Sequence, residues 1–508
     1  MTQCIVTEHE WKDLQGWKDY GISLSTPSNE AAKMLDALMT QLFRWYEDET
    51  LGGIVGTLKR IKEADPDYVL GPLLQSRFKL SSHRLETSPE LQASLKEMED
   101  LANAHPVTDW EMKLVGVVKD FATGHRHKSL RTLEEMVVDN PRDFFALRLA
   151  YMFALTLGDW AGIKSIMPKV LATWTPDMAF YGYIHGMYGF VLNEFKQPKE
   201  AEKYTSKALN INPCDCWSTH ATAHILVETN RAEEGIKFME KNEPKWTTGT
   251  FLLEHNYWHW ALFHLDKGDY ESVIGILDDY IISECCPGTS FALCDASSLL
   301  YRLEMEGVPT GKRWEAINSL WSPSEHASVF IEVHMMMNHL CAKDYESANS
   351  LLESCEKFVS EGKGTSWEVT KEVGVSLCEA MIAFDKAKYD DVVELLLPVR
   401  DDVIRIGGSN AQRDVFNLLL THAAIQCSGS KYKNLGRKLI QERKQSDGET
   451  GVTERLQERL LRRHPWRKYQ NNLSRVELDL WENSWGILKN GHISAGLCAR
   501  RRNGSKCT

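Results

Sequence analysis

Small and apolar residues recur along the chain with the spacing of short helices, and prolines end these helices at corresponding places. Residues 196–213, KQPKEAEKYTSKALNINP, begin with a turn and continue as a helix that places Ala201 and Ala208 on one face. Residues 124–141 and 49–66 have the same layout. Because proline cannot continue the interior of a helix, each closing proline marks a helix end. The pattern predicts a series of similar helical units.

Turn signals repeat in register with these units. Each follows an apolar helical stretch, and they are LGDW (157–160), KGDY (267–270), AKDY (342–345) and AKY (387–389). The early units repeat at about 34 or 38 residues, and 34 is the period of the tetratricopeptide repeat. A unit of two short helices cannot bury its own apolar face, so neighbouring units must stack. The sequence therefore predicts an all-α superhelical solenoid of about eight or nine tetratricopeptide-like hairpins, with an irregular helical bundle as the alternative. The equivalent packing positions are Ser129, Ile163, Ala201, Gly235, Val273, Ala348 and Val392.

Three regions are expected along the 508 residues. Residues 1–16 form a variable N-terminal segment, 17–463 the solenoid, and 464–508 a basic tail that we expect to be disordered. The whole chain has a net charge of −12, which does not favour nucleic acid as a partner of the solenoid. Only the arginine-rich sequence ARRRNGSK in the tail suggests contact with nucleic acid, and a solvated tail without a partner is the alternative.

The composition is typical of a soluble globular protein, with 43% hydrophobic and 26% charged residues. No apolar run is as long as a membrane span, and the first residues lack the pattern of a secretory signal. Twelve cysteines occur without any C-x-x-C spacing, which predicts reduced, mostly buried thiols instead of a disulfide framework. We therefore expect a cytoplasmic protein that does not contact a membrane.

Several stretches are more specific than the repeat pattern. They resemble the tetratricopeptide repeat protein 38 family of TPR-like helical repeat proteins, and the resemblance extends over roughly residues 11–460. It implies an all-helical, cytosolic repeat protein, and it implies no established activity. The stretches are WKDYGISLSTPSNEAAKMLDALMTQ (17–41), LGGIVGTLKRIKEADPDYVLG (51–71), HNYWHWAL (255–262), LYRLEMEGV (300–308) and ELLLPVRDDVIRIGGSNAQRDVFNLLL (394–420).

Two histidine pairs carry the main candidate chemistry. His220 and His224 lie in STHATAHILVE, and His255 and His259 lie in HNYWHWAL. Each pair has i, i+4 spacing and so occupies one face of a helix. The pairs are separated by about one repeat, so they fall on neighbouring first helices, which line the concave groove of such a solenoid. Four converging imidazoles predict a divalent transition metal, zinc or iron.

Carboxylates near these helices are candidates to complete or orient the ligands. Asp295 lies on the next first helix, and Glu228 follows His224 by a further i+4 step. An open coordination position would allow hydrolytic or oxidative chemistry, although no H-E-x-x-H pattern supplies a general base. Two alternatives remain: the histidines pack into the core, or they line a pocket that binds a small molecule or peptide without metal.

Four further residues are candidates for ligand binding in the groove. Trp258 would anchor a partner, and Arg302 and Arg413 would bind a carboxylate or form a salt bridge to an earlier repeat. Asp414 follows in the first turn of a helix that the pair Ser409 and Gln412 opens as a capping box. Each of these residues also has a purely structural interpretation as a packed or locally paired side chain.

We therefore expect a cytoplasmic repeat protein whose concave groove binds a protein segment, a peptide or a small ligand, without a required enzymatic activity. The alternative is a metal-binding protein or metal-dependent enzyme centred on the two histidine pairs. The candidate ligand-binding residues are His220, His224, His255, Trp258, His259, Asp295, Arg302, Arg413 and Asp414.

Overall fold

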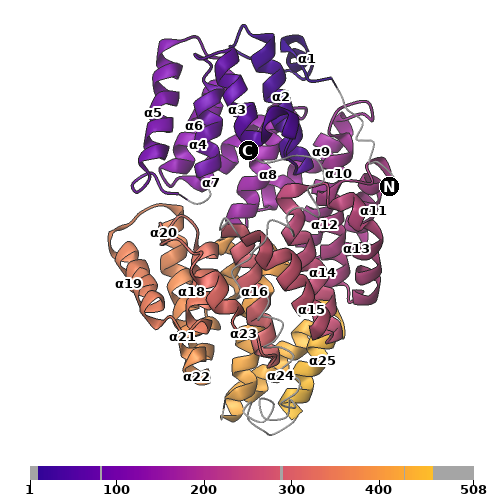
Figure 1. Ribbon diagram of the computed structural model, residues 1–508, viewed down its shortest axis with the longest axis vertical. Coiled ribbons are helices and arrows are strands. Elements are labelled where there is room, and N and C mark those ends of the chain that lie inside the picture. Colours follow the sequence, from indigo (N-terminus) through magenta and orange to yellow (C-terminus); the bar gives the residue numbers. More distant parts are fainter. Residues whose placement is uncertain (1–9, 81–82, 286–289, 428, 462–508) are drawn as a thin grey trace, which may run out of the picture.

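The structure is a computed structural model that describes residues 10–80, 83–285, 290–427 and 429–461. All regular secondary structure within these ranges is helical, which confirms the predicted all-α class (Figure 1). The predicted basic tail, residues 464–508, lies outside the described residues.

Most helices pair with the next helix through a short turn, as the repeat pattern predicts. The short helix α1 (Leu14–Asp19) precedes the first pair, and α25 (Gly451–Leu461) follows the last pair. The pairs are α2 (Asn29–Arg44) with α3 (Gly53–Ala64), α4 (Leu70–Lys79) with α5 (Pro89–Ala104), α6 (Asp109–Ala122) with α7 (Arg126–Asp139), α8 (Phe144–Leu157) with α9 (Ala161–Thr173), α10 (Tyr181–Glu194) with α11 (Pro198–Ile211), α12 (Cys216–Glu228) with α13 (Ala232–Trp246), α14 (Leu253–Lys267) with α15 (Tyr270–Ile276), α16 (Ser290–Glu306) with α17 (Arg313–Asn318), α18 (Val329–Cys341) with α19 (Tyr345–Glu361), α21 (Val375–Asp385) with α22 (Tyr389–Leu396), and α23 (Asn410–Gln426) with α24 (Ser430–Asp447). The short α20 (Thr365–Val369) precedes α21, and the 3-10 helix η6 (Arg400–Ile406) precedes α23.

The repeated turn signals mark the turns inside these hairpins. Each of the four contains one residue in the left-handed region, with φ of 64° at Gly158, 73° at Gly268, 61° at Lys343 and 55° at Ala387. A left-handed residue after the last helical turn reverses the chain and ends the helix. The predicted packing positions are buried between helices, as Ala201 and its equivalents show.

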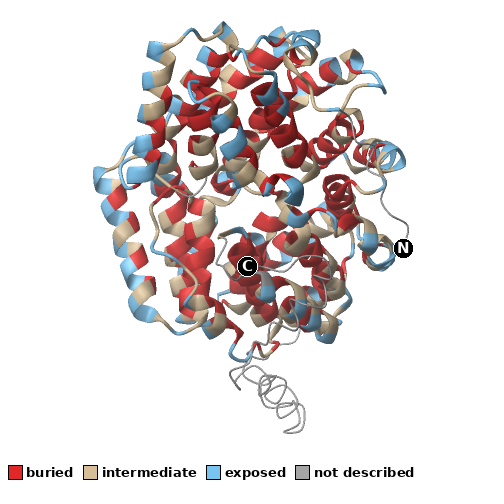
Figure 2. Cartoon of the chain, turned by 45° about the horizontal axis from the view of Figure 1, so that its top comes forward, coloured by how far each residue is buried: buried red, intermediate tan, exposed pale blue. Residues whose placement is uncertain are grey.

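Sequence also sets where the histidine-bearing helices begin and end. The Asp215 carboxylate accepts hydrogen bonds from the backbone N–H groups of Trp217 (3.0 Å) and Ser218 (3.2 Å), so α12 starts at Cys216. Helix α14 ends at the left-handed Gly268. Buried residues follow the inner faces of the hairpins, and exposed residues follow the outer helices (Figure 2).

The array curls until its last helices contact its middle ones. Helix α23 packs against α12 and α16, α25 packs against α14, and η6 packs against α8 (Figure 1). Residues 409–427 and 429–461, which include α23 to α25, form what we call the C-terminal cover. The cover lies on the inner side of the middle repeats, where the repeat pattern predicts an open groove.

None of the described helices is both long and apolar enough to cross a membrane. Six cysteines of the described residues are free, and five of them are buried. Cys214 is disulfide-bonded, so the expectation of reduced thiols is correct for those six cysteines and wrong for Cys214.

Candidate metal centre

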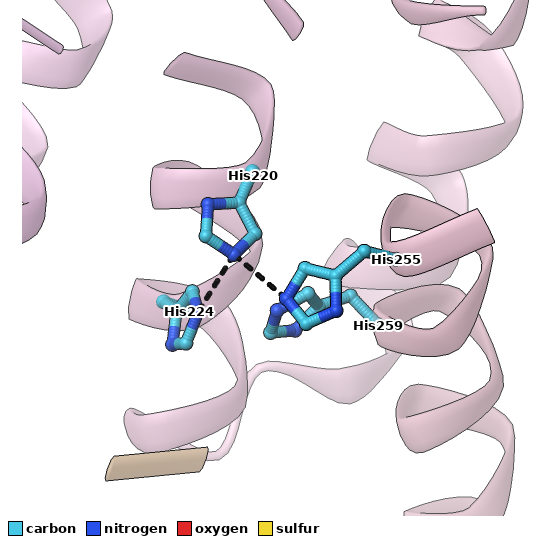
Figure 3. A group of neighbouring side chains, drawn as sticks. All are labelled: His220, His224, His255 and His259. Carbon is cyan, nitrogen blue, oxygen red and sulfur yellow. Dashed lines mark hydrogen bonds between the residues drawn. The ribbon is translucent and has the colours of Figure 1, made fainter. Parts of the chain in front are cut away.

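The four predicted histidines converge between two neighbouring helices. His220 and His224 project from α12, and His255 and His259 project from α14 toward them (Figure 3). The Nε2 atom of His220 lies 2.9 Å from Nε2 of His224 and 3.1 Å from Nε2 of His255. The rings of His224 and His259 have centroids 4.2 Å apart. One nitrogen from each of the four rings lies within 4.8 Å of the other three.

These distances suit ligands of a single ion. Nitrogens bound to zinc at about 2.0–2.1 Å in a tetrahedral site are separated by roughly 3.3 Å. Hydrogen bonds alone do not explain the cluster, because a neutral imidazole has only one N–H to donate. His220 Nε2 faces two other ring nitrogens at once, and a shared cation satisfies all three.

Unpartnered nitrogens give a second indication. Neither ring nitrogen of His259 has a hydrogen-bond partner, although this side chain is completely buried. The Nδ1 atoms of His220 and His224 are also buried without a partner. Buried polar atoms without partners are uncommon in proteins, and an ion bound among these rings would give one nitrogen of His259 a partner.

Another buried histidine in a comparable cluster behaves differently. His326, Glu332 and Cys355 are also close enough to be metal ligands. However, His326 Nδ1 lies 2.6 Å from the Glu332 carboxylate and Nε2 lies 2.7 Å from the Ser354 hydroxyl. Both nitrogens of His326 are therefore satisfied by the protein, and this cluster is explained as a hydrogen-bonded network.

Burial favours the neutral form of three of these histidines, His220, His224 and His259, and the neutral form is the one that binds metal. Desolvation lowers the pKa of His224 to about 3 and lowers the pKa values of His220 and His259 well below their usual range. Neighbouring imidazoles lower the pKa values of His220 and His259 further, because two adjacent imidazolium ions would repel. The neutral imidazoles can bind a cation at neutral pH without first losing protons.

One carboxylate orients a histidine of the cluster. Asp295 on α16 lies 2.7 Å from Nδ1 of His255, and both side chains are buried. This contact places the proton of His255 on Nδ1 and leaves Nε2 as a lone-pair donor directed at His220. Glu228 is placed similarly near His224, but its Oε1 atom is 3.9 Å from Nδ1, which is longer than a hydrogen bond.

Trp258 and Arg302 are stacked one on the other next to His255. Trp258 is completely buried, and its ring stacks on His255 at a centroid distance of 5.3 Å. The Arg302 guanidinium lies over the Trp258 ring at 5.4 Å and donates to the backbone carbonyl of Ala411 at 2.8 Å. These two residues pack in the interior and do not line an open surface.

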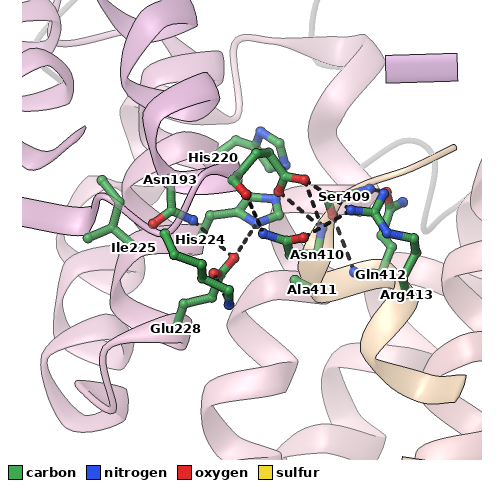
Figure 4. Close-up of polar contacts among 12 residues, drawn as sticks. Asn193, His220, His224, Ile225, Glu228, Ser409, Asn410, Ala411, Gln412 and Arg413 are labelled. Carbon is green, nitrogen blue, oxygen red and sulfur yellow. Dashed lines mark hydrogen bonds and ion pairs between the residues drawn. The ribbon is translucent and has the colours of Figure 1, made fainter. Parts of the chain in front are cut away.

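Arg413 and Asp414 lie near the four-histidine cluster, but each forms an ion pair with another charged residue. Arg413 donates to Glu194 of α10 at 3.2 Å, which is the contact to an earlier repeat that one interpretation of the sequence predicts (Figure 4). Asp414 accepts from Arg443 of α24 at 2.5 and 2.9 Å. Arg443 lowers the pKa of Asp414 against the opposing effect of burial.

The predicted groove residues are therefore not freely accessible. The four histidines, Trp258, Asp295, Arg302 and Arg413 are all buried, and Asp414 is half-buried. The stacking of α12 against α14 buries the four histidines, and α23 packs against α12 and α16 beside them. Sequence patterns identify which face of each helix is apolar, but they do not show which distant segment covers it.

Sequence reasoning missed three residues beside the site. Glu194 on α10 is buried next to His224 and Glu228, and one ligand atom from each of the three lies within 4.8 Å of the others. Asn193 donates to Glu228 at 3.0 Å, and Lys196 donates to it at 2.7 Å. The sequence could have indicated these residues, because they lie about one repeat before Glu228, at the end of the preceding first helix.

No protein-family model matches the chain. One solved structure similar to it is a monomeric mutant of IFIT1 in complex with Gppp-AAAA. The two share 13% sequence identity, with 89% of this chain and 98% of that chain covered and a TM-score of 0.38. A likeness of this degree supports no inference about the ligand or activity of this protein.

Proposed function

We propose that this chain is a metal-binding helical-repeat protein in which His220, His224, His255 and His259 hold one divalent transition metal. The observation that carries the proposal is the convergence of four buried imidazoles, several of whose nitrogens lack other partners. Zinc is the preferred ion, because it favours four nitrogen ligands in a tetrahedral arrangement, and iron is the second.

The proposed metal joins two consecutive repeats. Two of its ligands come from α12 and two from α14, so the ion links the first helices of neighbouring hairpins. Four protein ligands without an open position are typical of structural zinc sites. We therefore propose a stabilising role for the metal and propose no reaction.

We also propose membership of the tetratricopeptide repeat protein 38 family and a cytoplasmic location. Both rest on the resemblance of the sequence to that family.

Binding of a small ligand is a second candidate function, and a cavity of about 230 Å³ favours it. None of the four histidines lines the cavity, which lies between α16, α18 and the segment that precedes α18. Apolar side chains of Leu293, Ile331 and Met335 and the polar side chains of Glu325 and Ser328 line it. Pockets of mixed character like this one bind small molecules through a few directed polar groups.

The metal content of untagged protein tests the first proposal. We expect about one equivalent of zinc or iron by mass spectrometry, since one set of four ligands holds one ion. The double variant His220→Ala/His259→Ala should lose this metal. The control His334→Ala removes a buried histidine of α18, whose Nδ1 donates to the Phe330 carbonyl, and should retain the metal. Less than about 0.1 equivalent of any transition metal, with melting unchanged by a chelator, would contradict the proposal.

A further inference from the structure

The C-terminal cover is fastened to the metal-bearing repeats at two places, and the first is the start of α23. Glu194 at the end of α10 accepts hydrogen bonds from the backbone N–H of Asn410 at 3.0 and 3.1 Å. Arg413 adds the ion pair to the same carboxylate, and both side chains of this pair are buried. A carboxylate at the N-terminal end of a helix also interacts favourably with the helix dipole.

The second fastening is α25, which ties together the ends of α14 and α16. Arg455 donates to the backbone carbonyls of Leu265 and Asp266 at 2.8 and 2.9 Å. Arg459 donates to the carbonyls of Met305 and Glu306 at 2.5 and 2.8 Å. Both arginines also reach the Glu306 carboxylate. They supply partners for helix-end carbonyls that would otherwise need water.

A chain of polar contacts connects the metal centre with the cover. Glu228, beside His224, accepts from Lys196 at 2.7 Å. Lys196 also lies 3.5 Å from Asp447, the last residue of α24. On the neighbouring helix, Glu194 links the same region to Arg413 (Figure 4). The two carboxylates nearest to His224 therefore also contact the cover, Glu194 directly through Arg413 and Glu228 through Lys196.

The fastening by α25 and the contacts of Lys196 are ion pairs and hydrogen bonds that water can replace, whereas the pair of Arg413 with Glu194 is buried. Arg455 and Arg459 keep about a quarter of their side chains exposed, at 23% and 25%, and Lys196 keeps 49%. Partly exposed polar contacts open locally at lower cost than an apolar core does. By contrast, the four histidines have no comparable exposure, because each is at most 3% exposed. A metal can leave or enter only if something that covers them moves.

We propose that the C-terminal cover controls exchange of the metal at the four-histidine centre. The proposal rests on the proposed function, since it concerns regulation of the same site. The docked cover retains the ion, and release of the cover opens the route for exchange. By linkage, loss of the ion weakens docking of the cover, because the metal-free imidazole nitrogens gain hydrogen bonds when water enters.

Metal-release kinetics test the proposal on the full chain. Zinc-loaded protein is mixed with an excess of a chromogenic chelator, and the rate of zinc transfer is recorded. Arg413→Ala and the double variant Arg455→Ala/Arg459→Ala should each release zinc at least about tenfold faster than the wild type, because the closed state is less populated. Their initial zinc content should remain one equivalent.

The control variant is Arg437→Ala. Arg437 is exposed and donates to Asn434 inside α24, so the change removes the same charge from the cover without breaking a contact to α10, α14 or α16. Its release rate should equal that of the wild type. Equal rates for Arg413→Ala, the double variant and Arg437→Ala would overturn the proposal. Protein that contains no metal would instead refute the proposed function.

Hydrogen exchange of the unmutated protein provides a test that does not depend on the variants. Amide exchange in α24 and α25 is compared before and after zinc removal, with α6 and α7 as the reference hairpin. We expect faster exchange in α24 and α25 after zinc removal, and little change in the reference hairpin. Unchanged exchange in α24 and α25 would overturn the coupling even if every variant failed to fold.

Discussion

His220 and His255 lie 35 positions apart in the chain, yet their Nε2 atoms are 3.1 Å apart. The sequence separation is one repeat, so stacking of two consecutive hairpins creates this contact. The same stacking aligns the second histidine of each pair, because His224 and His259 each follow by one helical turn. The candidate metal centre is thus a consequence of the repeat geometry applied to two i, i+4 pairs.

The Asp295→Asn variant should bind metal more weakly. Asp295 holds Nδ1 of His255 at 2.7 Å, and loss of such an outer partner typically reduces metal affinity about 10–100-fold. Competition with a chelator of known affinity measures the change. Asp278→Asn is the control, since Asp278 pairs with Arg313 and does not contact the histidines. Equal affinities of the two variants would contradict the orienting role of Asp295.

Stability of the metal-free protein should fall as the medium becomes acidic. Burial lowers the pKa of His224 to about 3, and the pKa of this residue in an unfolded chain is near 6.5. Between these values the unfolded chain binds a proton that the folded chain excludes, so the free energy of unfolding decreases with decreasing pH. The decrease is up to about 1.4 kcal/mol per pH unit for each such histidine.

Melting of the metal-free protein at several pH values between 7 and 5 measures this effect. The pKa values of His220 and His259 are lowered in the same direction, so they add to the slope. The His259→Gln variant should show a shallower dependence on pH than the wild type. If the melting temperature of the wild type rises as the pH is lowered from 7 to 5, these histidines are not held neutral.

Removal of the metal should lower the melting temperature of the wild type. An ion that binds only the folded state stabilises it by about 2.7 kcal/mol at a free concentration of one hundred times the dissociation constant. Calorimetry with and without a chelator measures the shift, and re-addition of zinc should restore the original melting temperature. The His220→Ala/His259→Ala variant should melt at the same temperature under both conditions. A chelator-dependent shift in that variant would place the stabilising metal elsewhere.

The Gly407→Ala variant should destabilise docking of the segment that leads into α23. Gly407 has a φ of 91°, and a Cβ atom there would lie 2.3 Å from the backbone carbonyl oxygen of Thr156 on α8. Backbone atoms cannot yield as a flexible side chain does, so we expect a loss of about 1–3 kcal/mol in the free energy of unfolding.

Chemical denaturation compares this variant with Gly275→Ala. Gly275 lies within α15, and nothing is within 4 Å of the position that its Cβ would take. Alanine there should stabilise the helix by about 0.5–1 kcal/mol, because it has the higher helix propensity. Equal effects of the two substitutions would mean that the contact between Gly407 and α8 does not contribute to stability.

Local sequence patterns were sufficient to predict the hairpins and the convergence of the histidines. The turn residues Gly158, Gly268, Lys343 and Ala387 lie where the repeated signals placed them, because backbone conformation there depends on neighbouring residues. The two histidine pairs meet because helical periodicity and repeat length are both visible in the sequence. Whether they bind a metal stays a prediction.

The closure of the array could not be predicted from those patterns. The contact of Arg413 with Glu194 joins residues 219 positions apart, and that of Arg459 with Glu306 joins residues 153 positions apart. Neither contact follows from periodicity, since a repeat pattern describes only neighbouring units. Arg302, which lies over Trp258, donates to Ala411 of α23, so the surroundings of these two residues include a segment that is distant in the chain.

X-ray absorption at the edge of the bound metal identifies the ligands of the ion. We expect a first shell of four nitrogen ligands at about 2.0–2.1 Å with the multiple-scattering pattern of imidazole rings. The His334→Ala control should give the same spectrum, and the His220→Ala/His259→Ala variant should give no such spectrum. A first shell that contains sulfur, or one dominated by oxygen without imidazole scattering, would contradict a four-histidine metal centre.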